Sequence, residues 1–293
     1  MRRGGREEAL VLRRDPPGHV IESSREGEAA LLEAAAAAGV PVPRVRWLER
    51  DPSVLGAPFF VMDFVEGETI GKRLVRDAAF AAARDVLPEQ IARALARIHA
   101  IDPSLPALAF LARPAAGRSP AQVELERYRD VLRSIAPEPH PVLELAIRWL
   151  GLRIPRSETL AVVHGDFRIG NVIVGPDGLR AVLDWELAHA GDPLEDLGWF
   201  CVRSWRFGND QQPAGGLCDR ERFLKAYEEA RGVHVDRDAV RWWEIYGNLK
   251  WAVICIMQAQ TFLRGVPNVE LASLGRRTAE MEWELLELMD ESR

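Results

Sequence analysis

Residues 162–200 read VVHGDFRIGNVIVGPDGLRAVLDWELAHAGDPLEDLGWF, and this stretch decides the fold. Short apolar runs alternate in it with polar residues: His164 and Asp166 follow one run, Asn171 precedes the next, and Asp184 ends a third. Runs of this length around a Pro-Asp-Gly turn predict short strands. The polar residues offer oxygen ligands, which Mg²⁺ prefers in proteins, and no sulfur. The stretch therefore favours phosphoryl transfer, a reaction that needs positioned oxygen ligands more than covalent help.

The composition excludes several classes of protein. The chain has 293 residues, of which 47% are hydrophobic and 28% charged, enough for a folded core and about two domains. The net charge of −6 and the scattered Lys and Arg residues argue against a nucleic-acid partner. The most apolar helical stretch carries a lysine and is too short to cross a bilayer, so we expect no membrane partner.

The cysteines and the N-terminal residues indicate a cytoplasmic protein. Cys201, Cys218 and Cys255 are odd in number and lack CxxC spacing, so they predict neither a disulfide framework nor a zinc site. The first residues, MRRGGREEALVL, contain no apolar segment of the kind found in signal peptides. The sequence does not reveal the oligomeric state.

The chain divides into a strand-rich part and a helical part near "VEGETI". The segments "ALVLRR", "RVRWLER" and "PFFVMDFVEG" predict strands, and "SSREGEAALLEAAAAAG" predicts a helix. Short strands are also expected within 160–185. Helical periodicity covers 77–101, 120–135, 139–150, 219–231, 236–264 and 270–290. We therefore expect an α+β fold with two domains, residues 1–67 and residues 68–293.

The spacing of the polar residues resembles that of kinases. In kinase catalytic loops an Asp is followed after four residues by an Asn, as Asp166 is followed by Asn171. His-Gly-Asp in place of His-Arg-Asp, and Leu-Asp-Trp-Glu in place of Asp-Phe-Gly, resemble the aminoglycoside phosphotransferase and choline kinase-like family. "HGDFRIGNVIV", "AVLDWELAHAGDPLEDLGWF" and "GVPVPRV" look most like the phosphotransferase domains fused to acyl-CoA dehydrogenases, and their bacterial stand-alone relatives.

The resemblance covers the chain from "LVLRRDPPG" onward and implies a protein kinase-like fold with two lobes, a small β-rich lobe and a large, mainly helical one. It implies an enzyme that uses Mg²⁺ and ATP, with GTP left open, to phosphorylate a hydroxyl of a small molecule. Asp166 matches the catalytic base, and Asn171 and Asp184 match the magnesium ligands. His164 matches a residue that braces the catalytic loop, and Asp196 matches an aspartate that hydrogen-bonds the loop backbone.

The resemblance also implies where the adenine of the nucleotide would bind. Met62 would lie at the back of the adenine site. The backbone of Asp63 and Val65 would pair with the base, so side-chain chemistry gives no independent signal for these positions.

Phosphate contacts are implied for the first long strand. Strand alternation places Arg13 on the face opposite Leu12, where protein kinases hold a phosphate-binding lysine. Its carboxylate partner would be Glu28, with Glu26 as the rival. Only eight residues precede "ALVLRR", so the family's glycine-rich loop is missing from the sequence. Either the start codon is assigned too late or the N-lobe is shortened, and the alternative function is a pseudokinase-like binding or regulatory module.

The acceptor is suggested only by analogy. A polycationic aminoglycoside would need an acidic wall, yet the helices after residue 200 carry both signs of charge. The likeness to domains linked to acyl-CoA dehydrogenases favours a hydroxylated acyl metabolite. The aromatic residues Trp242, Trp243, Tyr246 and Trp251 recur at helical spacing, which favours core packing over a substrate wall.

Overall fold

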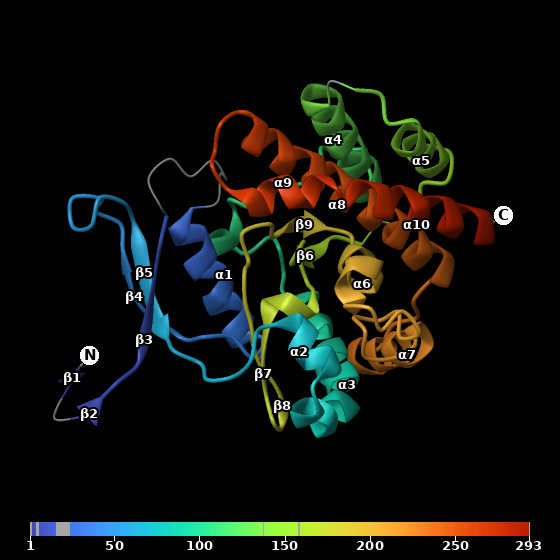
Figure 1. Cartoon of the computed structure of the whole chain (residues 1–293). Coiled ribbons are helices and arrows are strands. Elements are labelled where there is room, and N and C mark those ends of the chain that lie inside the picture. Colours follow the sequence, from blue (N-terminus) through green and yellow to red (C-terminus); the bar gives the residue numbers. More distant parts are fainter. Residues whose placement is uncertain (1, 4–5, 16–23, 137, 158, 293) are drawn as a thin grey trace.

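The computed structural model describes residues 2–3, 6–15, 24–136, 138–157 and 159–292 (Figure 1). Strands dominate the first part of the chain and helices dominate the rest, with two short two-stranded sheets embedded among the helices. The expected α+β class is confirmed. Within the described residues, no helix is both long enough and apolar enough to span a membrane.

The N-terminal part is built on a three-stranded antiparallel sheet. Its strands are β3 (Leu10–Arg14), β4 (Val45–Glu49) and β5 (Phe59–Asp63), in the order β3-β5-β4. Two short strands, β1 (Arg2–Arg3) and β2 (Arg6–Glu7), pair with each other ahead of this sheet. Because side chains alternate along a strand, Leu12 lies on an exposed face while Arg13 faces the other way.

Helix α1 (Arg25–Ala37) lies beside this sheet, on the side of the helical part (Figure 1). It begins where the Ser24 side chain accepts a hydrogen bond from the Gly27 N–H, and it buries Leu31 and Leu32 in the core. The chain leaves the helix through Gly39, whose φ of +78° is a left-handed conformation that glycine adopts without a steric penalty. Sequence and structure agree closely on this helix.

The connection between the two parts is fastened to a strand of the helical part. Glu68 and Val174 exchange backbone hydrogen bonds of 2.9 and 3.0 Å. Gly67 allows this approach, because a Cβ atom there would lie 2.5 Å from the Ile173 side chain. The strand-rich part is thereby held against the segment that carries Asn171.

The helical part contains nine further α-helices, four 3₁₀ turns and four short strands among the described residues. The helices are α2 (Gly71–Arg76), α3 (Ala81–Ile98), α4 (Pro120–Ile135), α5 (Pro141–Gly151), α6 (Leu194–Cys201), α7 (Arg220–Arg231), α8 (Arg237–Leu263), α9 (Val269–Gly275) and α10 (Thr278–Glu291), and η4 (Arg203–Arg206) is the 3₁₀ turn that matters below. The strands are β6 (Ala161–Val163), β7 (Val172–Gly175), β8 (Gly178–Val182) and β9 (His189–Gly191). They pair antiparallel as β6-β9 and β7-β8.

Two helix predictions were wrong in detail. The helix expected over 77–101 is a 3₁₀ turn followed by α3, and the one expected over 270–290 is broken between α9 and α10 at Arg276 and Arg277. Gly275 weakens the helix just before this break. Helix α6 lies outside the ranges that helical periodicity predicted, because it has only eight residues, and only the resemblance, through Asp196, placed a helix there. Gly198 brings α6 against α8, since a Cβ there would lie 2.5 Å from that of Trp243.

Helix α8 is the longest helix and packs against α4, α5, α6, α9 and α10. Trp242, Trp243 and Tyr246 are buried in this core, with the Trp242 and Tyr246 rings stacked 5.9 Å apart. Core packing therefore accounts for these three aromatic residues. Trp251, further along the helix, is only half-buried; it packs against the edge of this core and contacts Trp205.

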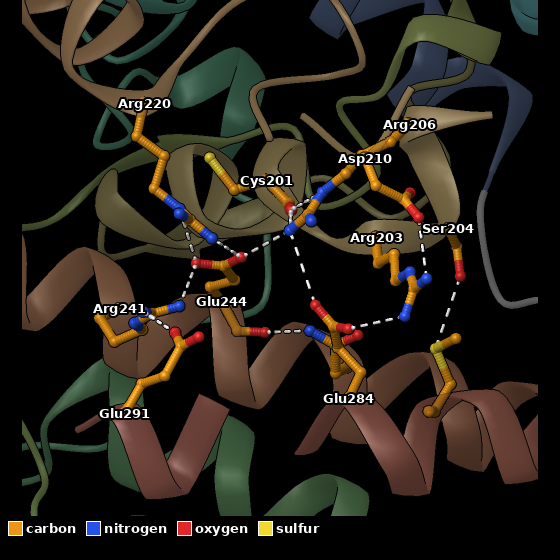
Figure 2. Close-up of polar contacts among 12 residues, drawn as sticks. Cys201, Arg203, Ser204, Arg206, Asp210, Arg220, Arg241, Glu244, Glu284 and Glu291 are labelled. Carbon is orange, nitrogen blue, oxygen red and sulfur yellow. Dashed lines mark hydrogen bonds and ion pairs between the residues drawn. The ribbon is translucent and has the colours of Figure 1, made fainter. Parts of the chain in front are cut away.

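A buried glutamate on α8 joins three arginines (Figure 2). Glu244 is fully buried and accepts hydrogen bonds from Arg206 at 3.0 Å, Arg220 at 2.6 Å and Arg241 at 3.4 Å. Arg206 lies in η4 and Arg220 begins α7, while Arg241 also pairs with Glu291 of α10 at 2.7 Å. One carboxylate thus ties η4 and α7 to α8, and Arg241 extends the network to α10.

The Glu244→Gln substitution should destabilise the fold strongly. It removes the only negative charge in hydrogen-bond contact with Arg220 among the described residues, and it leaves the buried Arg206 poorly compensated. Removing one member of a buried ion pair costs about 3–5 kcal/mol of unfolding free energy. The exposed pair partner Glu291 supplies the control, because Glu291→Gln should cost less than about 1 kcal/mol. Equal losses in urea denaturation of the two variants would contradict this assignment.

Candidate active site

A tight turn after β6 presents the first polar residues. Strand β6 is fully buried, and the chain leaves it through His164, Gly165 and Asp166. Gly165 has a φ of +78°, and a Cβ atom there would lie 2.4 Å from the carbonyl oxygen of Leu187. Only glycine fits this conformation beside that carbonyl. This turn directs the Asp166 side chain out of the core.

Asp196 holds the backbone of this turn from α6. Its carboxylate accepts the N–H groups of His164 at 2.8 Å and Gly165 at 2.9 Å. It also contacts His99 Nε2 at 3.1 Å, and the other ring nitrogen of His99 contacts the Tyr227 hydroxyl at 2.8 Å. Burial opposes ionisation of Asp196, but these hydrogen bonds and the nearby histidines hold its pKa below its usual range. A buried carboxylate that stays charged therefore anchors the loop.

His164 connects the loop to the strand that leads to Asp184. Its Nδ1 accepts the backbone N–H of Asp166 at 3.2 Å, which places the ring proton on Nε2, and Nε2 donates to the Leu183 carbonyl at 2.9 Å. The side chain is completely buried. Since both ring nitrogens are engaged, the geometry favours a bracing role over proton transfer.

The Asp166 carboxylate receives hydrogen bonds from three side chains. Asn171 Nδ2 donates at 2.6 Å, Trp199 Nε1 at 2.9 Å, and Arg168 Nε at 3.2 and 3.3 Å to the two oxygens. The backbone of Asn171 is also fixed, because its main-chain carbonyl accepts a hydrogen bond from the Leu183 N–H at 2.8 Å. The structure thus brings Asp166 and Asn171 into contact and fixes Asn171 beside the residue preceding Asp184. Sequence reasoning did not identify Arg168 or Trp199 as neighbours of the carboxylate.

Arg13 reaches Asp184 from the strand-rich part. Its Nη2 lies 3.3 Å from Asp184 and 3.6 Å from Glu186, and its Nε lies 3.4 Å from Glu28. Glu26, the rival partner, instead pairs with Arg50 at 2.7 Å on the surface. Burial opposes the charge on Arg13, yet the carboxylates around it raise its pKa. Arg13 remains a cation.

A hard divalent cation fits the donors near Asp184. Asp184 and Glu186 offer carboxylate oxygens, and the Asn171 amide oxygen is free to point away from Asp166 because its nitrogen makes that contact. Burial and, after it, the neighbouring negative charge of Asp184 raise the pKa of Glu186. Asp184 itself has a φ of +65°, an uncommon conformation for a residue other than glycine that is often found at functional sites.

The proposed adenine-binding positions lie at the end of β5. Met62 is partly buried against the core, and the Asp63 N–H already donates to the Arg44 carbonyl at 3.0 Å. The Val65 N–H donates to no backbone oxygen among the described residues. Of the two backbone N–H groups, only that of Val65 is therefore free to pair with a base.

Comparison with known proteins identifies the family. The model of the phosphotransferase enzyme family matches residues 1–243. The chain belongs to the phosphotransferase enzyme family. Mouse acyl-CoA dehydrogenase family member 10 is 35% identical over 199 residues, which are 66% of this chain but only 18% of that protein. The chain therefore spans less than a fifth of the length of this relative, and the expected likeness to acyl-CoA dehydrogenase-associated domains is confirmed.

Solved structures agree with the kinase-like fold of the phosphotransferase family. A Ralstonia eutropha protein assigned to the aminoglycoside phosphotransferases superposes with a TM-score of 0.76 at 25% identity, over 96% of this chain and 86% of that one. An aminoglycoside phosphotransferase from Streptomyces rimosus, solved with ADP and streptomycin, superposes with a TM-score of 0.56 at 20% identity, over 83% and 87% of the chains. The expectation of a kinase-like fold is confirmed.

A buried lysine also supports the loop that carries Asp166 in this phosphotransferase. Lys250 of α8 donates to the Gly165 carbonyl at 2.8 Å and pairs with Glu195 at 3.1 Å, and its ammonium lies 4.8 Å from the centre of the Trp199 ring. From the sequence, Lys250 was seen only as a charge that interrupts an apolar run. A charged residue in the middle of a buried helix was the available signal.

Glu195 is shared between Lys250 and a histidine of β9. His189 Nε2 lies 3.1 Å from Glu195, and Glu124 brings a third possible metal ligand within 4.8 Å of these two side chains. The carboxylates of Glu195 and Glu124 already lie beside two cations, Lys250 and protonated His189. The group is therefore better described as an ion-pair network than as a metal site.

The His189–Glu195 pair should make stability depend on pH. Burial opposes protonation of His189, but Glu195 outweighs it and raises the histidine pKa to about 9. The stabilisation is complete below the unfolded-state pKa of about 6.5 and is lost as the pH rises through about 9, a change of about 3 kcal/mol in unfolding free energy. Urea denaturation of wild type and His189→Asn should show a difference that shrinks between about pH 6 and pH 9.5. The control is His234→Asn, at an exposed position, and a pH-independent difference for His189→Asn would contradict the assignment.

Proposed function

We propose that this phosphotransferase transfers the γ-phosphate of ATP, with Mg²⁺, to a hydroxyl group of a small molecule. The observation that carries the proposal is the contact of Asp166 with Asn171 at 2.6 Å, next to the strand that ends at Asp184. A base and oxygen ligands for magnesium are thus side by side, as phosphoryl transfer requires. The family match and the ADP complex of a structural neighbour support nucleotide use.

In this proposal each residue has a separate task. Asp166 orients the acceptor hydroxyl and takes its proton as the acceptor oxygen bonds to the γ-phosphorus and the bond from phosphorus to the bridging oxygen breaks, releasing ADP. Asn171 and Asp184 are the ligands for Mg²⁺, which neutralises phosphate charge when bound. Glu186, whose carboxylate adjoins Asp184, is a further candidate ligand. His164 keeps the loop and the strand before Asp184 in register through its two hydrogen bonds.

Nucleotide contacts come from the strand-rich part. Arg13 is the phosphate-binding residue, held in place by Glu28, and its guanidinium group lies 3.3 Å from Asp184, where the phosphates and the metal would meet. Met62 lies behind the adenine, and the Asp63 carbonyl and the Val65 N–H pair with its edge. GTP remains the alternative nucleotide.

The acceptor is proposed from the relatives. The mouse relative is named an acyl-CoA dehydrogenase, so a hydroxylated acyl metabolite is a better candidate than a polycationic aminoglycoside. The reducing cytoplasm is the proposed location, which the free and buried Cys201, Cys218 and Cys255 support.

Calorimetric titration with ATP should separate a nucleotide-binding enzyme from a module that does not bind nucleotide. Wild type should bind ATP only with Mg²⁺, and Asp184→Asn should lose this magnesium-dependent binding because the substitution removes a charged ligand of the metal. Asp166→Asn should keep ATP binding but lose phosphoryl transfer in an acceptor screen, since the amide cannot take the hydroxyl proton. Asp177→Asn, in an exposed turn, is the control. Absence of ATP binding by folded wild type would reject the proposal in favour of a pseudokinase-like module.

Arg13→Gln should weaken ATP binding by about tenfold to a hundredfold, since a charge-assisted hydrogen bond contributes about 1.5–3 kcal/mol. Arg14→Gln is a matched control, because Arg14 follows directly in β3 and points to the other face. The same calorimetric titration measures both variants. Equal affinities for Arg13→Gln and Arg14→Gln would show that Arg13 does not bind the phosphates.

A further inference from the structure

Arg168 leaves most of its hydrogen-bonding capacity unused next to Asp166. It contacts the Asp166 carboxylate through Nε alone, at 3.2 and 3.3 Å. Neither Nη group donates to any other residue in the part of the chain that the structure describes. The guanidinium group has five N–H donors and is always charged, so four donors remain for a ligand. About a quarter of the side chain is exposed, which gives a ligand access.

The guanidinium plane is held by its surroundings. It lies over the ring of Trp205, with 4.9 Å from the guanidinium carbon to the ring centre. On another side, Gly170 makes room for it, because a Cβ atom there would lie 2.3 Å from Nη1. Trp205 is itself buried, and its Nε1 has no hydrogen-bond partner among the described residues. Arg168 therefore has a defined position and is not a freely moving surface arginine.

The distances indicate which contact of Asp166 gives way when an acceptor hydroxyl arrives. Asn171 and Trp199 donate to the carboxylate at 2.6 and 2.9 Å, whereas the two Arg168 contacts are the longest of the set. An approaching hydroxyl must take one of the occupied acceptor positions on this carboxylate. Arg168 is the donor most easily displaced, and its partly buried charge then needs another anionic partner.

We propose that Arg168 binds an anionic oxygen group of the acceptor, so that the substrate carries a carboxylate or a similar anion near the phosphorylated hydroxyl. A planar guanidinium group with free Nη donors matches a carboxylate in a bidentate arrangement. The hydroxyl and the anion of one substrate would together replace the contact between Asp166 and Arg168. This inference rests on the proposed function and narrows the acceptor to hydroxy acids and related anions.

The experiment uses NMR of the full chain labelled at tryptophan indole nitrogens, without nucleotide. The probes are short straight-chain ω-hydroxy carboxylates and, for comparison, the uncharged diols of the same chain length. The Trp205 signal is assigned from the spectrum of Trp205→Phe and should shift saturably with a hydroxy acid. The Trp149 signal is the internal control, because Arg153 stacks on Trp149 at 4.4 Å and makes no carboxylate contact among the described residues.

We expect the acids to bind at least about tenfold more tightly than the diols. Arg168→Gln should abolish that preference, Arg168→Lys should restore part of it, and Arg153→Gln should leave it unchanged. Equal binding of acids and diols, a preference that survives Arg168→Gln, or no saturable shift with any probe would each overturn the inference. Acid binding without phosphoryl transfer would reject the proposed function alone, whereas transfer to uncharged alcohols in preference to acids would reject this inference alone.

Discussion

The buried carboxylate of Asp196 is the constraint on which the site depends. A tight turn after a buried strand leaves backbone N–H groups that need partners, and an unpaired buried N–H is costly. Asp196 satisfies those of His164 and Gly165, while His99 keeps the carboxylate ionised. A neutral acid would lose much of this charge-assisted bonding. The position of Asp166 is therefore set by a charge that never contacts it.

Helix α8 carries two further buried charges that act on different segments. Lys250 binds the Gly165 carbonyl, and Glu244 gathers arginines from η4 and α7. Buried ion pairs contribute little net stability compared with apolar residues of equal volume, but removing one partner is costly. Their effect here is geometric, since each side chain has one arrangement that satisfies its partners. The loop that carries Asp166 and the segment that carries Trp205 are thereby both held in place by the same helix.

Much of this architecture could be predicted from the sequence because the signals are local. The strands of the N-terminal sheet, helix α1 and the spacing of Asp166, Asn171 and Asp184 all follow from patterns within short segments. The close packing of α6 against α8 at Gly198 could not be predicted, because it depends on segments distant in the sequence. The neighbours of Asp166 could not be predicted for the same reason, since they also come from distant segments. Trp199 and Lys250 reach the loop from helices whose placement no local pattern encodes.

The contacts of Asp166 indicate how this carboxylate could act on one hydroxyl and not on water. In the structure its oxygens are occupied by Asn171, Trp199 and Arg168, so a water molecule gains little by approaching. Displacing Arg168 leaves a charge without a partner, a cost that water cannot offset because it brings no anion. A substrate that carries an anionic group can pair that group with Arg168 while its hydroxyl binds Asp166, and this new ion pair offsets the free energy lost when Arg168 leaves Asp166. Specificity would then arise from the free energy of releasing Arg168 rather than from the shape of a preformed pocket.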